Sequence, residues 1–187
     1  MKLAFLMPTT FSLGTPGNGV RIQALLQAKA LQELGHEVTF PNPSEIRDPA
    51  EYDLVQFFVG GAAFHMIEKT RPKPVRMLSF APMIDSNEPN WRYRMAAALG
   101  NVHGKLLTVP GLFRRQAMGS DLVIARSNHE RQRIVSGLGI NPSKVEIVLN
   151  GVEPPSSANP ELVRAKLQLP ERFVLHISAY GQARKNV

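Results

Sequence analysis

The sequence has no cysteine, which excludes disulfide bonds and thiolate-ligated zinc. This absence suits a reducing compartment. No apolar run approaches the roughly 18 residues that a membrane span needs. Residues 1–8 form a short apolar run that ends at proline, whereas a signal peptide needs a longer run and a small-residue cleavage site. We therefore expect a cytoplasmic protein whose first segment is a strand.

Long runs of one charge are also missing. The net charge is +7, but the cations are scattered, and no run of about five or more Lys and Arg indicates a nucleic-acid tail. Because a basic stripe and an aromatic platform are lacking too, we expect no nucleic-acid partner. Cations gather locally at 91–94 and 113–115. A solvated helix face is the favoured interpretation. The alternative is peripheral contact with anionic lipid or an acidic acceptor through Arg92, Arg94, Arg114 and Arg115.

Metal and hydrolase motifs are absent as well. The five histidines show neither HxxxH nor HExxH spacing, so no metal site is expected. No GxSxG nucleophile elbow is present. Asp85 and Glu88 could form a carboxylate pair in a cleft, but acidic residues are routine in the kind of Pro/Asn/Ser loop that holds them.

What the sequence does contain is a regular alternation of short apolar runs with helical stretches. This alternation predicts βαβ units, and the continuous Val, Ile, Leu and Phe runs indicate strands covered by helices on both faces. The expected fold is therefore an α/β, Rossmann-like, doubly wound and mainly parallel sheet. The candidate strands are Lys2–Met7, Glu37–Phe40, Asp53–Val59, Val75–Phe80, Asp121–Ala125 and Val145–Leu149.

Helix signals lie between these strands. A broadly apolar helix is expected from about Asn18 to Leu34, ended by Gly35. Ser127 and Glu130 have the spacing of a capping box, in which each side chain accepts from the other residue's amide, and Gly137 and Gly139 offer that helix its end.

The stretch from 88 to 118 should hold two helices that break near Gly100–Asn101, with Pro110–Gly111 kinking or ending the second. Proline, serine and asparagine crowd residues 154–160, a composition typical of a linker. We therefore expect a first domain over 1–155, and over 156–187 the linker, one helix (161–169) and one strand (173–178) of an incomplete second domain.

Three segments could bind ligand. The glycine loop at 14–19 lets backbone amides approach an anion at a helix N-terminus, through Gly17, Asn18 and Gly19, although a simple strand-to-helix turn explains it equally well. Arg184 and Lys185 could clamp a diphosphate, or could simply be an exposed basic loop. Arg126 follows a strand at the carboxyl end, where a doubly wound sheet holds its ligands.

Four segments, in the right order over nearly the whole chain, resemble the retaining, family 4 glycosyltransferases of the GT-B fold. Residues 17–20 and 35–38 look like the family's glycine loop and "GHEV" turn. Residues 120–127 are similar to its "ADxVIxxS" strand. Residues 144–153 resemble its "KIxVIPNGVD" segment, and residues 174–187 the "VLxVGRLxxxKN" opening of its second domain.

The resemblance implies an enzyme that moves a sugar from a nucleotide-sugar to an acceptor with retained anomeric configuration. It implies that Gly17, Gly19 and Lys185 face the donor diphosphate and that the first domain holds most of the acceptor. From their positions in the sequence, we expect the acceptor, a sugar, lipid-linked or other molecule, to lie beside Arg126 and Asp85. No metal or other cofactor is expected. The motif that holds the donor sugar would lie beyond Val187, so no catalytic residue is expected in this chain and the chain alone should be inactive.

Some residues depart from the family pattern. Ala179 and Tyr180 stand where the family has "GR", which alters half of the diphosphate clamp, and the histidine often found after the fourth strand is missing from residues 79–82. Two alternatives stay open, the first favoured by these departures and the second by the shared fold. One is a catalytically degenerate module that binds a sugar nucleotide or a partner. The other is a nucleotide-sugar 2-epimerase, although the acidic and histidine cluster of such enzymes is not seen.

Overall fold

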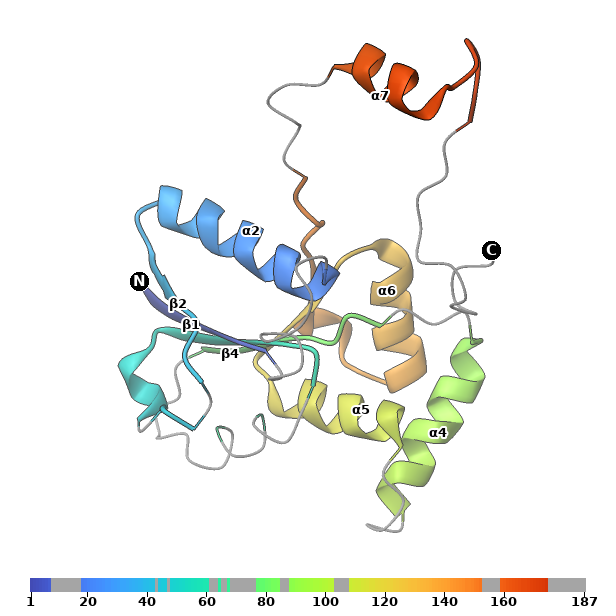
Figure 1. Ribbon diagram of the computed structural model, residues 1–187. Coiled ribbons are helices and arrows are strands. Elements are labelled where there is room, and N and C mark those ends of the chain that lie inside the picture. Colours follow the sequence, from blue (N-terminus) through green and yellow to red (C-terminus); the bar gives the residue numbers. More distant parts are fainter. Residues whose placement is uncertain are drawn as a thin grey trace. The chain divides into compact units, whose positions relative to one another are not determined.

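A computed structural model describes residues 1–7, 18–42, 44–46, 48–60, 64, 67, 77–84, 88–102, 108–152 and 159–174 of the chain (Figure 1). The chain divides into two compact units, Met1–Gly151 and Val152–Val187. The sequence-based boundary after residue 155 stays a prediction. In the described part of the chain, no helix combines the length and the apolar character that crossing a membrane requires.

Within the described residues of the first unit, one sheet has six strands, all paired in parallel in the order β2-β1-β3-β4-β5-β6. This arrangement confirms the predicted α/β, Rossmann-like fold. The strands differ from the predicted ranges at both ends: β1, β2, β3 and β6 end one or two residues early, β3, β4 and β5 begin one or two residues late, and β4 continues one residue further, to Ala81. The strands are β1 (Lys2–Leu6), β2 (Glu37–Thr39), β3 (Leu54–Phe58), β4 (Met77–Ala81), β5 (Leu122–Ala125) and β6 (Val145–Ile147).

The sheet separates two apolar cores, because successive strand residues point to opposite faces. In β3, Val55 and Phe57 belong to one core and Phe58 to the other. Helix α2 (Gly19–Glu33) covers the face with the Phe58 core, and α5 (Val109–Gly119) covers the opposite face (Figure 1). Helix α4 (Asn90–Val102) adds Ala97 to the core of that opposite face, and α6 (Asn128–Gln132) leads into a turn that adds Ile134. The predicted burial of both faces is thus confirmed in the described residues.

Helix α2 lies where the sequence predicts it, within one residue at each end. Asn18 is its N-cap, and its side-chain oxygen accepts from the amides of Val20 (2.9 Å) and Arg21 (3.4 Å). Ala24 and Ala28 are buried against the sheet, and their small side chains let the helix approach closely. Gly35 follows with φ of +82°, the left-handed conformation that glycine adopts without Cβ strain.

The two helices predicted between 88 and 118 are confirmed, and α4 ends within about one residue of the predicted break, but the role of Pro110 was predicted wrongly. Helix α4 continues through Gly100 to Val102, and Pro110 begins α5 instead of ending it. Thr108 is the N-cap of α5: its hydroxyl accepts from the amide of Gly111 (3.1 Å) and donates to the carbonyl of Ala96 (2.7 Å). Proline at the first helical positions loses no hydrogen bond, so the sequence signal belongs to a helix start.

Short segments complete the first unit: η1 (Pro49–Glu51) precedes β3, and η3 (Pro142–Lys144) precedes β6. In the second unit, α7 (Pro160–Leu167) is capped by Asn159 and ends two residues before the predicted Leu169, where Gln168 is left-handed (φ 51°). The start of the predicted strand 173–178 is wrong, because Phe173 and Val174 are not in a strand. Its other residues lie outside the described ones.

Candidate functional site

The carboxyl edge of the sheet is the natural place for a ligand. The strand order reverses between β1 and β3, so the connections from these two neighbours leave in opposite directions. In open α/β sheets, ligands bind in the crevice outside the carboxyl ends of the strands at such a switch point. The segments that leave β1, β3, β4 and β5 therefore define the candidate site.

At the α2 end of this edge, the predicted anion-binding residues are only partly described. The Asn18 side chain is engaged as the helix cap, so its role in the structure is to satisfy amides of the first turn. Gly19 is exposed, and a Cβ added there would meet nothing within 4 Å. That open space at a helix N-terminus is compatible with the predicted contact to an anion. Gly17 lies outside the described residues.

Arg126 follows β5 at the same edge. Its side chain pairs with Glu130, a residue that the sequence predicted only as part of a capping box. Its Nε donates to Glu130 Oε2 (2.9 Å) and its Nη2 to Glu130 Oε1 (3.3 Å). The side chain of Arg126 is 19% exposed, and that of Glu130 only 3%. Arg126 is thus held in one orientation by a buried ion pair.

The capping box at Ser127 is confirmed in its first half only. The Ser127 hydroxyl accepts from the amide of Glu130 (3.1 Å), as predicted. The Glu130 carboxylate, however, accepts from the amide of Arg126 (2.8 Å), one residue before the predicted donor. Burial explains the shift, because a carboxylate that also receives the Arg126 guanidinium gains charge-assisted hydrogen bonds.

Glu130 also reaches the neighbouring strand exit. Its Oε1 accepts from the amide of Ile84 at 2.5 Å, in a buried hydrogen bond. One carboxylate therefore ties the end of β4 to the end of β5. The i,i+4 spacing of Arg126 and Glu130 was a sequence signal for their pair, but nothing in the sequence marked Ile84.

Arg133 holds the next part of the β4–α4 connection. It opens the π-helical turn η2 (Arg133–Gly137) and is 4% exposed. Its guanidinium lies 5.1 Å from the ring centroid of Tyr93, and its Nη1 donates to the carbonyl oxygen of Glu88. π-Helical turns are frequent at functional sites. Glu130 and Arg133 together fix the two residues, Ile84 and Glu88, that flank 85–87.

Backbone strain gathers at the same strand exits. Val59 follows β3 with φ of 58°, and Met83 follows β4 with φ of 55°. A left-handed conformation is a genuine outlier for a β-branched residue such as Val59. The amide of Val59 donates to the carbonyl of Ala81 (2.9 Å), and the amide after Met83 is the one that Glu130 accepts from. Strained residues of this kind cluster at ligand sites, each at a cost of about 1–3 kcal/mol.

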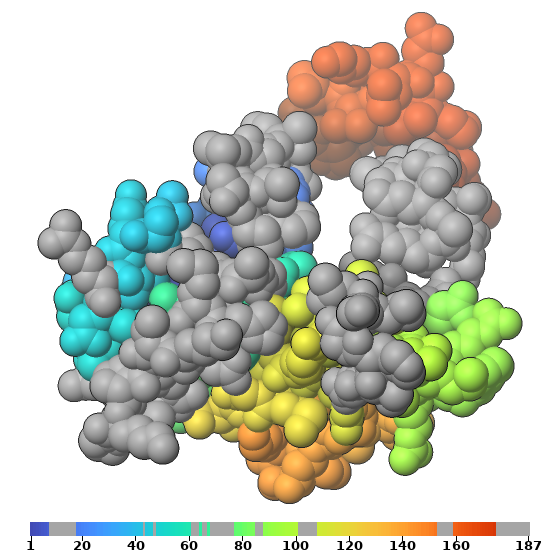
Figure 2. All heavy atoms as spheres, turned by 90° about the horizontal axis from the view of Figure 1, so that it is seen from below, coloured from blue at the N-terminus to red at the C-terminus, as the bar shows by residue number. Residues whose placement is uncertain are grey.

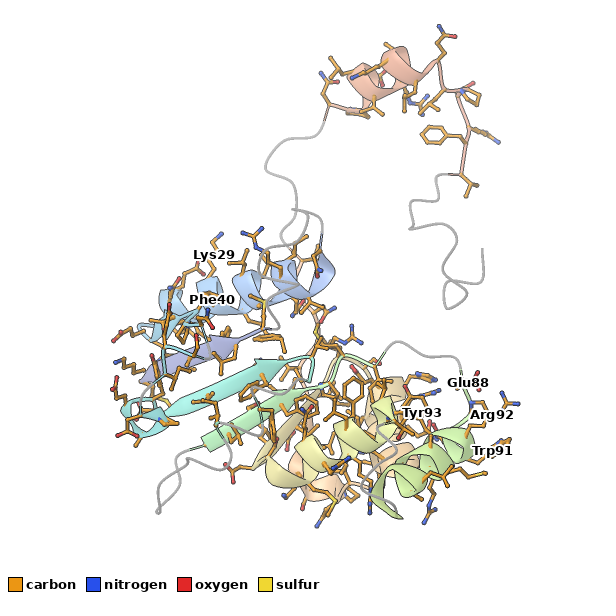
Figure 3. All side chains as sticks on the ribbon, turned by 60° about the horizontal axis from the view of Figure 1, so that its bottom comes forward. Lys29, Phe40, Glu88, Trp91, Arg92 and Tyr93 are labelled. Carbon is orange, nitrogen blue, oxygen red and sulfur yellow. The ribbon has the colours of Figure 1, made fainter. Side chains whose placement is uncertain are left out.

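An open groove of about 400 Å³ lies beside α4 and the start of α5. It is lined by Glu88, Arg92, Tyr93, Ala96 and Pro110. Figure 3 shows Glu88 and Arg92 at the N-terminal end of α4, where the β4–α4 connection enters the helix. Glu88, which lines the groove, therefore lies five residues after the strained Met83 at the end of β4.

Other predicted site residues cannot be placed. Asp85, Arg184 and Lys185 lie outside the described residues, so their roles stay predictions. Among the residues that the structure does describe, no group of three or more His, Asp or Glu side chains could hold a metal ion.

Comparison with known proteins gives similarity in structure alone. No protein-family model and no curated protein sequence matches the chain. The crystal structure of Anabaena Alr3699/HepE in complex with UDP is similar with a TM-score of 0.50 and 19% identity, over 90% of this chain and 50% of that one. The same protein with UDP and glucose gives a TM-score of 0.47 and 17% identity over the same shares. This chain therefore spans about half the length of the proteins it matches, and the likeness shows the fold.

Proposed function

We propose that this chain is the acceptor-side part of a retaining glycosyltransferase that uses a nucleotide-sugar donor. The observation that carries the proposal is the carboxyl edge of the sheet, with its switch point between β1 and β3, in a fold similar to that of a protein crystallised with UDP. The four sequence segments that resemble family 4 glycosyltransferases support the same conclusion.

In this proposal the donor diphosphate is bound by groups that carry positive charge. The N-terminus of α2, with Gly17 and Gly19, offers backbone amides and the positive end of the helix dipole. Arg184 and Lys185 add cations. As the bond between the anomeric carbon and the diphosphate oxygen breaks, these groups stabilise the charge that develops on the leaving diphosphate.

The acceptor would lie along the exits of β4 and β5, where Glu130 fixes both the Ile84 amide and the Arg126 side chain. The acceptor hydroxyl oxygen bonds to the anomeric carbon on the face that the diphosphate leaves, which retains the configuration, and its proton is released. A site that is rigid before binding loses less entropy when the acceptor is positioned. Asp85 stays a proposed acceptor contact.

The test compares donor turnover by the 187-residue chain with donor turnover by the longest protein that its gene encodes. Both are incubated with UDP- and GDP-sugars, and anomers and epimers are identified by NMR. Transfer or slow hydrolysis with retention is the expected result for the longest product. Formation of a 2-epimer would favour the epimerase, and calorimetric binding without turnover the degenerate module. Either outcome would overturn the proposal.

A matched pair of variants tests the diphosphate contact. Lys185→Ala should weaken donor binding more than about tenfold, because a charge-assisted contact to phosphate is lost. Lys166→Ala changes the net charge equally at an exposed position of α7 and should leave donor binding unchanged. Equal effects of the two variants would contradict a specific role for Lys185.

A further inference from the structure

The segment from Pro89 to Ser120, which contains α4 and α5, has an unusual charge distribution. It carries five cations and no acidic residue, although the whole chain has 15 Asp and Glu. The cations are Arg92, Arg94, Lys105, Arg114 and Arg115. Four of these cations, all except Lys105, lie on the adjacent helices α4 and α5.

A row of large apolar side chains lies on the outward side of α4. Trp91, Met95 and Leu99 are four residues apart, so they lie one above another on the helix, and they are 59%, 56% and 53% exposed. Ala97 is buried, and Tyr93 packs against the core. Single exposed apolar residues need no explanation, whereas an aligned row marks a contact surface. We call Trp91, Arg92, Arg94, Met95 and Leu99 the outward face of α4.

One cation of this face, Arg92, lies beside its tryptophan. The guanidinium of Arg92 lies 5.4 Å from the Trp91 ring centroid and also pairs with Glu88 (2.9 Å), an exposed ion pair. Arg94 is exposed and forms no ion pair with any residue that the structure describes. Figure 3 shows Trp91 and Arg92 directed away from the sheet, and in Figure 2 α4 (green) reaches the surface of the first unit.

The other two arginines predicted from the sequence differ from each other. Arg114 donates from Nε to the carbonyl of Leu138 (3.0 Å) and is half-buried, so it is not counted in the outward face. Arg115 is exposed on α5.

We propose that the outward face of α4 docks on an anionic membrane surface. Indole rings favour the membrane–water interface, and arginine keeps its charged head at the headgroups while its stem covers apolar surface. Met95 and Leu99 would enter the acyl boundary, as the apolar face of an interfacial helix does. A nucleic acid would gain little from contact with the apolar side chains of Met95 and Leu99, because its backbone is charged and hydrated. A membrane therefore fits this face better than a nucleic acid does. The proposal does not depend on glycosyl transfer.

The experiment uses the emission of Trp91, the chain's single tryptophan, as a direct reporter. The protein is titrated with vesicles of phosphatidylcholine alone or mixed with phosphatidylglycerol. We expect a shift to shorter wavelength with the mixed vesicles and little with phosphatidylcholine. About 1 M NaCl, at which the Debye length is about 3 Å, should weaken binding at least tenfold. No shift with anionic vesicles would overturn the proposal, as would equal binding to both vesicle types.

Matched exposed variants locate the surface. Arg94→Glu should weaken vesicle binding about twentyfold or more, since each cation near an anionic surface contributes about fivefold. Arg172→Glu, the same exchange at an exposed position of the second unit, should change it less than threefold. Similar losses in both variants would mean that net charge alone drives binding and would contradict a specific face.

The apolar row is tested separately from charge. Met95→Gln combined with Leu99→Gln should weaken binding about tenfold or more, because both side chains leave the acyl boundary. Leu162→Gln, at a leucine that is 66% exposed on α7, is the control and should have no effect. If single-stranded RNA binds the protein more tightly than the vesicles do, or if the double variant binds normally, the face is a polyanion site and the membrane proposal is wrong.

Discussion

The charged groups at the start of α6 and those on α4 have opposite surroundings. The Glu130 side chain is 3% exposed and accepts from the Arg126 side chain and the Ile84 amide. The side chains of the ion pair at the start of α4, Glu88 and Arg92, are 53% and 59% exposed. A buried charge must be paired, because water no longer stabilises it. An exposed pair gains little, because water screens it. The α6 charges therefore hold the carboxyl edge of the sheet in shape, while the Glu88–Arg92 pair lies in solvent at the surface.

The largest expected effect comes from breaking the buried side of this comparison. Glu130→Ala leaves the Arg126 guanidinium and the Ile84 amide without their acceptor and should lower the free energy of unfolding by about 3 kcal/mol. Urea unfolding followed by circular dichroism measures it. A loss below about 1 kcal/mol would show that Glu130 does not hold the strand exits together.

Arg133→Met should have the next largest effect on stability. The variant keeps a long apolar stem but loses the hydrogen bond to the Glu88 carbonyl and the contact with Tyr93, at a cost of about 2 kcal/mol. Hydrogen exchange adds a local measurement: the amides that open the first turn of α4 should exchange faster, while those of β1 should not change. Arg131→Met, at the partly exposed arginine two residues earlier, is the control. Unchanged exchange in α4 would contradict the role given to Arg133.

The sequence predicts the elements of this region better than its contacts. Apolar runs and caps place β5, α6 and Ser127 within a residue or two, since those signals are local. The hydrogen bonds of Glu130 to Ile84 and of Arg133 to Glu88 join residues 46 and 45 positions apart, and no local pattern encodes such pairs. Pro110 was misinterpreted because proline marks a helix start as well as an end. On α4, the row at 91, 95 and 99 has the spacing of a buried face, and only the structure shows that it is exposed.

Backbone strain at the carboxyl edge of the sheet predicts a smaller effect on stability. Val59→Gly removes the penalty of a left-handed valine (φ 58°), which offsets the greater backbone entropy of glycine in the unfolded chain. We expect the free energy of unfolding to stay within about 1 kcal/mol of the parent. Val55→Gly, in the middle of β3 and 4% exposed, should cost about 3 kcal/mol or more. Thermal unfolding of both variants makes the comparison, and similar losses would show that Val59 is not strained.

The smallest change in stability should come from Glu88→Gln, in the exposed ion pair with Arg92. This variant best separates the exposed charges of α4 from the buried charges of α6. The exchange breaks the pair with Arg92 but keeps the Glu88 backbone carbonyl that Arg133 binds, so the free energy of unfolding should change by no more than about 0.5 kcal/mol. Removing a negative charge beside the outward face of α4 should at the same time strengthen binding to anionic vesicles about fivefold, measured by Trp91 emission. A variant that lost more than about 1 kcal/mol with unchanged vesicle binding would place Glu88 with the structural charges of α6, because its carboxylate would then act on the fold and not on the surface.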